Sequence, residues 1–169
     1  MSDPLRALAF GERSLTLAMQ SREPFRVCRA LALVAATRSA MGVSARGPAE
    51  RLMRAAESLA STIDHPETVA LARLAAGNVP VFFGEWRRAL SSLDEAEALL
   101  RERCRNVAWE RSNALYQGSS VRIFLGELAD AARRVPAAVR EAIERDDRHA
   151  LSNMVYSATV THLAADDPE

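Results

Sequence analysis

The residues that could carry out chemistry are few, and their spacing does not bring a reactive set together. His65 and His149 stand at predicted helix starts, and His162 has no second histidine or cysteine three or four positions away. A metal site needs several converging ligands. The pairs Asp146–Asp147 and Asp166–Asp167 fit helix capping better than acid–base work, because adjacent side chains point apart. We therefore expect no catalytic residue, no cofactor and no metal site in this chain.

The aromatic and hydroxyl residues are more typical of packing than of chemistry. Trp86 and Trp109 could stack on a ligand, but both stand at predicted helix starts within apolar stripes, where tryptophan commonly packs. The serines Ser112, Ser119 and Ser120 have no nearby base that could make a nucleophile of them. Their small size suits a close approach between helices.

The charged residues exclude several classes of function. The formal net charge is zero, all 22 basic residues are arginine, and the chain has no lysine. A phosphate-loop ATPase, a protein kinase and a Schiff-base enzyme each need a lysine. A nucleic-acid-binding domain normally has a basic face, and this sequence has only isolated Arg-Arg pairs. We expect no nucleic-acid partner and no enzymatic activity from this chain alone.

Cysteine usage and hydropathy indicate the compartment. Cys28 and Cys104 are far apart and lack CxxC spacing, so we expect free thiols in a reducing environment. The N-terminal residues 1–4 lack the basic-then-apolar pattern of a signal peptide. The longest apolar run, residues 30–36, is too short to span a bilayer. The expectation is a soluble, cytoplasmic protein with no membrane partner.

Helical periodicity with proline and glycine punctuation divides the chain into about eight helices, and no segment alternates like a strand. Apolar residues recur at helical spacing throughout, and prolines mark several helix starts. Pro80 should kink the end of its helix, and Pro136 predicts a kink or a break in another. The predicted helices cover residues 4–21, 24–41, 48–63, 66–83, 85–103, 107–125 and 127–145, and a last one runs from the Asp146–Asp147 cap to about residue 165.

A repeat of about 42 residues organises these helices. Gly42, Gly84 and Gly126 stand at a constant interval between helix-like stretches, and the next interval falls at Pro168. Recurrence at a fixed period is typical of repeat proteins. The sequence therefore predicts a single all-α domain over residues 1–169, an α-solenoid of antiparallel helical hairpins with junctions near 42, 84, 126 and 168. We expect the array to continue beyond residue 169 in a longer parent protein.

The junction residues 84–90, Gly-Glu-Trp-Arg-Arg-Ala-Leu, resemble the start of the second helix of a tetratricopeptide repeat. The period departs from the roughly 34 residues usual for that repeat, so the fold is tetratricopeptide-like. Residues 84–167 resemble the helical-repeat region that follows the catalytic domain in some bacterial eukaryotic-like serine/threonine protein kinases, and regions of multidomain ATPase regulators. The stretches that carry this resemblance are 101–109, 125–129, 134–136, 144–147 and 164–168. Two places depart from the pattern: Asn106 stands where the resemblance implies glycine, and Arg148–His149 stand where it implies an apolar–aromatic pair. No catalytic residue is carried over.

In tetratricopeptide folds the first helix of each pair lines the concave face. This resemblance implies a set of polar side chains on that face, where arginine and amide groups could hold a carboxylate or phosphate of a partner segment. Ordinary solvated positions remain the simpler interpretation for each of them. The candidate partner-binding residues are Arg38, Arg73, Asn113, Gln117, Arg122 and Asn153.

The leading functional hypothesis is a non-catalytic scaffold for protein–protein interaction or sensing, in the form of a regulatory arm of a bacterial serine/threonine kinase signalling protein. Its partner would be a peptide, a partner helix or an attached kinase domain. The alternative is a standalone regulator that binds a small molecule between repeats. An all-α enzyme is the third hypothesis, and no converging acid, base, nucleophile and metal set supports it.

Overall fold

The computed structural model describes residues 4–63 and 65–165, and these residues form helices joined by short turns. The prediction of an all-helical fold with eight α-helices is confirmed for this part of the chain. Pro168 and the pair Asp166–Asp167 lie outside the described residues. The helices are α1 (Pro4–Ser21), α2 (Pro24–Ser39), α3 (Arg46–Ala60), α4 (Pro66–Val81), α5 (Trp86–Arg103), α6 (Ala108–Phe124), α7 (Leu128–Glu144) and α8 (Arg148–Ala164), and a short 3₁₀ turn η1 (Val43–Ala45) precedes α3.

Side-chain caps and prolines set several helix starts. The Glu23 carboxylate accepts hydrogen bonds from the backbone N–H groups of Phe25 and Arg26 at the start of α2. Asp147 accepts from the N–H of Ala150 at the start of α8, which confirms the predicted cap there. These contacts satisfy N–H groups that have no partner within the helix. α3 begins at Arg46, two residues before the predicted start at Pro48, because proline is tolerated in a first turn.

The junctions between helices use left-handed backbone conformations. Gly84 has φ 74° and Gly126 has φ 75°, a region that costs glycine nothing because it has no Cβ. Asn106, the departure from the expected glycine, has φ 60° between α5 and α6. Asparagine is one of the few other residues that adopt this conformation readily. Asparagine at position 106 therefore allows the left-handed turn between α5 and α6 that a glycine would also allow.

Proline inside a helix is tolerated at both predicted positions. α4 continues through Pro80 and ends one residue later, at Val81. α7 continues through Pro136, which is exposed, so the predicted alternative of a break in this helix is wrong. A proline removes one backbone donor, and the remaining hydrogen bonds of a long helix can hold it together.

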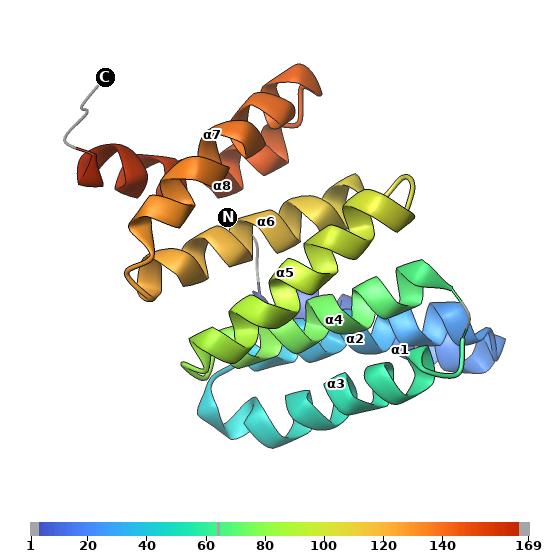
Figure 1. Cartoon of the computed structure of the whole chain (residues 1–169). Coiled ribbons are helices and arrows are strands. Elements are labelled where there is room, and N and C mark those ends of the chain that lie inside the picture. The colour runs from blue at the N-terminus through green and yellow to red at the C-terminus, as the bar shows by residue number, and fades with distance from the viewer. Residues whose placement is uncertain (1–3, 64, 166–169) are drawn as a thin grey trace.

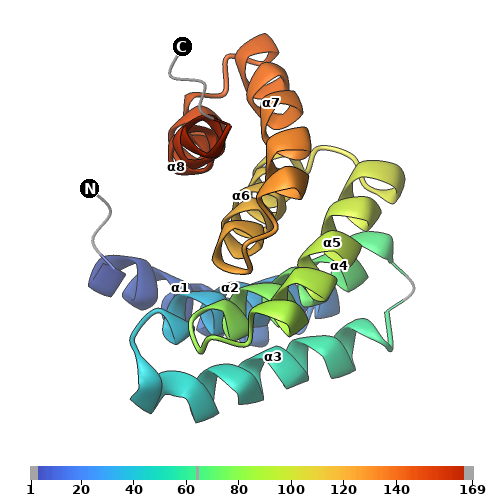
Figure 2. The same ribbon diagram turned by 60° about the vertical axis from the view of Figure 1, so that its left-hand side comes forward.

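The helices form an inner and an outer row. Each helix packs on the next one in the chain, and α2, α4, α6 and α8 also pack on one another in that order. Figure 1 shows α5 in front of α4, α7 in front of α8, and α3 along the lower edge beneath α2. Figure 2 shows that the inner row follows a curve, with α3, α5 and α7 on its outer side. The inner side of the curve is therefore built by α2, α4 and α6, with α8 continuing it.

α4 is the most deeply buried helix. Between Thr68 and Pro80 only Val69 and Arg73 are exposed. One face of α4, which includes Leu71 and Val79, packs in a hydrophobic cluster with α2 and α3. Another face, with Ala70 and Leu74, packs in a second cluster with α5 and α6. A helix covered on two sides must be apolar nearly all round, which explains its composition.

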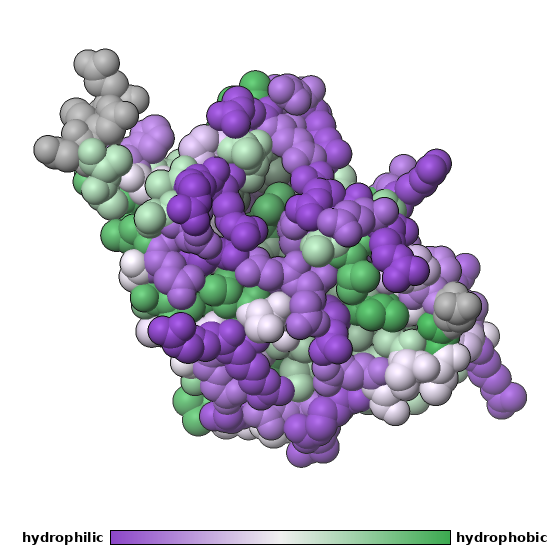
Figure 3. Space-filling model, in the orientation of Figure 1, coloured by the Kyte–Doolittle hydropathy of each residue, from purple (hydrophilic) through white to green (hydrophobic). Residues whose placement is uncertain are grey.

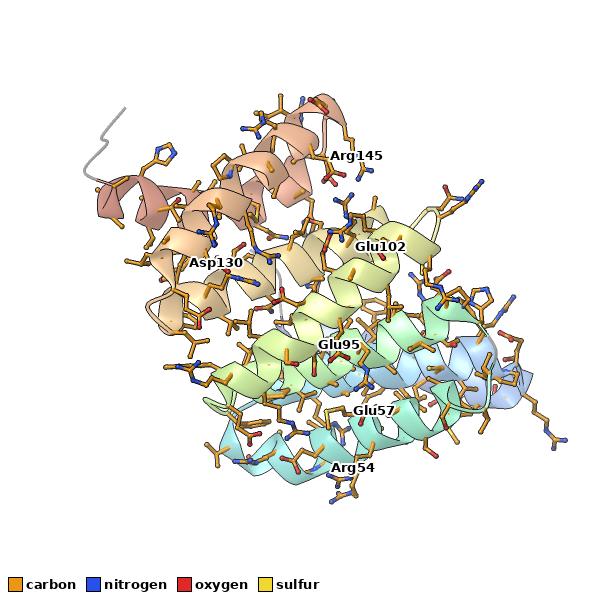
Figure 4. The ribbon with its side chains drawn as sticks, viewed as in Figure 1. Arg54, Glu57, Glu95, Glu102, Asp130 and Arg145 are labelled. Carbon is orange, nitrogen blue, oxygen red and sulfur yellow. The ribbon has the colours of Figure 1, made fainter. Side chains whose placement is uncertain are left out.

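The outer surface is predominantly hydrophilic. Figure 3 views the side on which α3, α5 and α7 lie, and polar side chains dominate it with smaller hydrophobic areas between the helices. Charged residues labelled in Figure 4 belong to these three helices or to their ends. None of the described helices is both long enough and apolar enough to cross a membrane.

Substitution of Gly77 tests how closely α4 and α5 pack. A Cβ added there would lie 2.5 Å from Leu93 Cγ and 3.1 Å from the Leu93 backbone nitrogen. We expect Gly77→Ala to lower the free energy of unfolding by about 1–3 kcal/mol, because a buried overlap must be relieved by moving a helix. Chemical denaturation followed by circular dichroism measures this change.

The matched control is Gly47→Ala in the exposed first turn of α3, where the nearest atom is the end of the Arg51 side chain at 3.5 Å. This control should leave the stability unchanged or slightly raised, because alanine favours a helix over glycine. Equal stability of the two variants would contradict the close packing at Gly77.

The Cys28 thiol should be inert in the folded protein. Its side chain is fully buried in the cluster of α2, α3 and α4, and burial raises its pKa from 9.0 to about 11. We expect iodoacetamide at mildly alkaline pH to modify the half-buried Cys104 first and Cys28 only on unfolding, because the thiolate is the reactive form. Mass spectrometry of tryptic peptides measures both rates.

The raised pKa of Cys28 also makes the free energy of unfolding depend on pH. The unfolded thiol ionises near pH 9.0 and the folded one near 11, so stability should fall as the pH rises through this window. A Cys28→Ser variant, which has no thiol to ionise, should lose this component of the pH dependence. Similar iodoacetamide labelling rates for Cys28 and Cys104 in the native protein would contradict the burial of the Cys28 thiol.

Candidate functional site

A groove lies on the inner side of the helix row. It is lined by one face each of α2, α4 and α6, with residues three or four positions apart on each helix, and it has a volume of about 520 Å³. No residue of α3, α5 or α7 lines it, so it opens away from the outer helices. We call it the inner groove; its lining residues are Arg29, Ala32, Leu33, Ala36, Thr37, Ala40, Leu71, Leu74, Ala75, Asn78, Phe82, Trp109, Glu110, Asn113 and Gln117.

The inner groove has an apolar floor and an aromatic rim. Ala75 and Leu74 are 1% and 5% exposed, so they form the floor. Phe82, directly after the end of α4, and Trp109 on α6 are 46% and 49% exposed and stand at the rim. Alanines on facing helices leave room between the backbones without exposing polar groups. Exposed aromatic rings beside an apolar floor offer contact area to a ligand.

A hydrogen-bonded amide pair lies within this apolar lining. The Asn78 side-chain nitrogen donates to the Asn113 side-chain oxygen over 2.9 Å and joins α4 to α6. Asn78 is only 6% exposed, and its side-chain oxygen Oδ1 has no hydrogen-bond partner. A buried polar atom without a partner costs free energy, so it needs an explanation.

An ion pair closes one end of the inner groove. Arg29 on α2 pairs with Glu110 on α6 over 2.6 Å and with Glu67 on α4 over 3.4 Å. The Glu110 side chain is only 4% exposed. A carboxylate so deeply buried needs its cation, since an unpaired buried charge is costly. Arg29 is therefore committed to this contact and also holds α2 against α4 and α6.

Two of the six predicted partner-binding residues line the inner groove. Asn113 and Gln117 both lie on α6 and face it. Asn153 lies on α8, outside the lining, and its amide nitrogen is 3.1 Å from the His149 ring nitrogen Nε2. The structure therefore brings together the two α6 amides and leaves the α8 amide apart from them.

Arg38 and Arg73 lie elsewhere and are engaged with acidic side chains. Arg38 forms an ion pair with Glu12 on α1. Arg73 reaches the outer helices, with Glu95 on α5 at 3.1 Å and Glu57 on α3 at 3.7 Å. Figure 4 shows Glu57 and Glu95 on that outer side. Neither arginine is among the residues that line the inner groove.

Arg122 lies inside the protein. Its side chain is 4% exposed and its Nη2 donates to both Asp94 carboxylate oxygens, at 2.6 and 2.7 Å. It also contacts Asp130 over 3.5 Å and the Gly118 carbonyl oxygen over 3.2 Å. These contacts tie α5, α6 and α7 together. The position of Arg122 assigns it to packing between helices, away from the inner groove.

Sequence reasoning missed several residues that shape the inner groove. Trp109 and Trp86 were both expected to pack in core stripes. Trp109 is instead 49% exposed at the rim. Trp86 is 37% exposed and lies against Phe124, with ring centroids 5.4 Å apart. Asn78 carried a usable signal, because it is the polar residue in an otherwise apolar stretch of α4. The pairing of Arg29 with Glu110 joins residues 81 positions apart and left no local pattern in the sequence.

The side chains around the inner groove have a composition that suits binding. Within the ranges 4–63 and 65–165 no group of three His, Cys, Asp or Glu residues could hold a metal ion. His65 is exposed and its ring meets the Phe25 ring edge-on, with centroids 5.3 Å apart. The inner groove instead combines apolar surface with a few placed polar groups, which is the usual composition of a recognition site.

The Arg122–Asp94 contact gives a stability prediction. We expect Asp94→Ala to lower the free energy of unfolding by about 1–3 kcal/mol, because it leaves a buried guanidinium with weaker partners. The matched control is Glu95→Ala, which removes a half-exposed partner of Arg73 and should cost less than about 1 kcal/mol. Urea denaturation measures both. A larger loss for the control would contradict the structural role of Arg122.

Comparison with known proteins adds no assignment to this geometry. No protein-family model matches the chain, and no curated protein matches it. Its function is therefore argued from the inner groove and from the residues that line it.

Proposed function

We propose that this chain is a non-catalytic, tetratricopeptide-like α-solenoid module that binds a segment of a partner polypeptide in the inner groove. The observation that carries this proposal is the inner groove itself, which has a volume of about 520 Å³ and a mainly apolar lining on one face of three stacked helices. A protein rarely keeps such a surface open to water without using it.

The helix arrangement supports the repeat module. Packing of α2 on α4, α4 on α6 and α6 on α8 repeats one contact along the chain, and the backbones of α3, α5 and α7 approach only the helices next to them in sequence. Gly42, Gly84 and Gly126 share positive φ at equivalent junctions. Stacked repeats of this kind create extended concave surfaces, which are commonly binding surfaces.

The partner class follows from the resemblance and from the charge distribution. An attached serine/threonine kinase domain is the candidate partner that the resemblance of residues 84–167 implies. Four arginines are paired with acidic residues of this chain, so they do not form a free basic face for a nucleic acid: Arg29, Arg38, Arg73 and Arg122.

One observation favours the second candidate, a small-molecule regulator. The volume of the inner groove falls within the range of roughly 300–1,000 Å³ that is usual for small-molecule sites. The groove nevertheless spans three helices and carries separate aromatic rings on α4 and α6, which suits a chain that lies across them. We therefore place the polypeptide ligand first.

Selection of displayed random peptides on the immobilised protein tests this function. Peptides that bind should lose most of their affinity for an Ala36→Arg variant, because Ala36 lines the inner groove on α2 and a long charged side chain would fill it. Fluorescence anisotropy with the selected peptides measures affinities, and a loss of at least about tenfold is expected.

The matched control is Ala55→Arg, an identical change at an exposed position of α3. It should bind the selected peptides as the wild type does, and thermal denaturation should show both variants folded. Peptides that bind equally well to the Ala36→Arg variant would place recognition outside the inner groove. Failure to select any peptide would contradict a polypeptide-binding function.

A further inference from the structure

The two ends of the helix stack expose the two halves of a contact that the stack uses internally. Figure 1 shows α8 at the upper end of the stack and α1, α2 and α3 at the lower end. In the middle, α4 packs through one face with α2 and α3 and through another with α5 and α6. Among the described helices, no inner helix precedes α2 and no outer helix follows α8. Each of these two helices therefore leaves open a face that α4 has covered.

The starts of the inner helices show which of their residues are equivalent. α2, α6 and α8 each begin two residues after a residue with positive φ: Arg22 at 54°, Asn106 at 60° and Asp146 at 50°. The shared turn fixes the register, because it sets where the first helical residue lies. When the starts of α2, α4, α6 and α8 are aligned, each position on one inner helix corresponds to one position on the others.

One face of α8 is covered in the way that the equivalent face of α4 is. Met154, Ser157 and Thr161 are at most 4% exposed. Their equivalents on α4 lie in the cluster with α2 and α3, and they are Ala72, Ala75 and Val79. α8 therefore presents to the preceding helices the same side that α4 presents to its own.

The other face of α8 is open to water. Tyr156 and Leu163 are 48% and 70% exposed. Their equivalents on α4, Leu74 and Val81, pack in the cluster that joins α4 to α5 and α6. The open face of α8 thus corresponds to a face that is a helix-packing surface elsewhere in the stack.

A second groove, between α1 and α2, lies at the opposite end of the stack. It has a volume of about 280 Å³, and we call it the end groove. Its α2 side includes Ala30 and Leu33, the equivalents of Ala72 and Ala75, through which α4 packs on the helices before it. Its α1 side is formed by Ser14, Leu17, Ala18 and Ser21.

The α1 side of the end groove is equivalent to a packed face of α3. Its four residues each stand 42 positions before a residue of α3 or of the turn after it that lies in or against the cluster of α2, α3 and α4: Ala56, Leu59, Ala60 and Ile63. α3 and α4 together hold α2 between them in that cluster. α1 and α2 therefore form the equivalent seat for one more inner helix.

The sizes of the side chains fit α8 as the occupant of this seat. In the internal cluster a small residue of α2, Ala32, and a large residue of α3, Met53, are both buried. At the ends the sizes are exchanged, because the equivalent of Ala32 on α8 is Tyr156 and the equivalent of Met53 on α1 is Gly11. A buried contact must keep its total volume, and this exchange does so.

The charges also fit. Residues 150–161 of α8 include no charged side chain. Two arginines line the end groove, and both are paired within the chain, Arg26 with Glu23 and Arg29 with Glu110. Neither arginine requires an anionic partner, so an uncharged helix can dock beside them.

From these matches we infer that α8 of one copy of this chain docks in the end groove of a second copy, so that copies associate head to tail and the inner row continues from one to the next. The two surfaces are different, so each complex keeps one open α8 face and one open end groove, and association proceeds beyond the dimer unless it closes into a ring. The inference goes beyond the proposed function, since it does not depend on what the inner groove binds.

Sedimentation velocity of the whole chain gives the first test, over concentrations from about 1 μM to about 1 mM. The weight-average mass should rise with concentration to at least about twice that of the monomer. A chain that stays monomeric throughout would overturn the inference. The peptide-binding proposal would still stand, because this measurement involves no peptide.

Two charge substitutions test the pairing of the surfaces. Val155→Arg blocks the α8 face beside Tyr156, and Leu17→Arg blocks the end groove; the two wild-type side chains are 61% and 57% exposed. Each variant alone should be monomeric, because one half of the contact is lost. An equimolar mixture should form a heterodimer and nothing larger, because it contains one intact α8 face and one intact end groove.

The matched control is Val43→Arg, the same change at a valine that is 83% exposed in the turn before α3 and lies on neither surface. It should associate as the wild type does, and circular dichroism should show all variants folded. If Val155→Arg does not fold, Leu163→Arg on the same face takes its place. Self-association of Leu17→Arg alone would indicate a symmetric contact between α8 helices and overturn the inference, as would a mixture that remains monomeric.

Discussion

A side chain at position 77 would occupy the space of Leu93, so α4 and α5 approach as closely as they do only because residue 77 is glycine. The same leucine also lies against α6, where its Cβ is 4.0 Å from the place a Cβ at Gly118 would take. Leu93 is 1% exposed and stands between two glycines on the inner row. This contact sets the spacing of α4 and α6 and, with it, the shape of the surface that they share.

The inner groove follows from that spacing. Because α4 is covered by α3 and α2 on one side and by α5 and α6 on another, nearly all its side chains are small or apolar. Where α2, α4 and α6 turn towards the inner side, these side chains form an apolar floor instead of a core. The one deeply placed amide of α4, Asn78, then meets Asn113 of α6 and keeps an oxygen free. This amide pair thus comes from packing geometry rather than from a local motif.

Arginine has a structural use in this molecule. Arg122 and Arg111 join α5, α6 and α7: Arg111 contacts Glu97 over 3.4 Å and Glu141 over 2.8 Å. The planar guanidinium group can bond several carboxylates at once and so suits contacts among three helices. In the inner groove, the lining arginine Arg29 is likewise paired, with Glu67 and Glu110.

The eight helices, most of their boundaries to within two or three residues, and the recurring glycine junctions could be predicted from local patterns, because periodicity, caps and left-handed turns depend on neighbouring residues. The predicted residues Asn113 and Gln117 do lie on the face that lines the inner groove. The contacts of Arg38, Arg73 and Arg122 could not be predicted, since their acidic partners stand on other helices. Only the tertiary structure joined Asn78 to Asn113 and Arg29 to Glu110. Contacts between distant residues depend on how helices stack, and spacing along one helix carries no record of them.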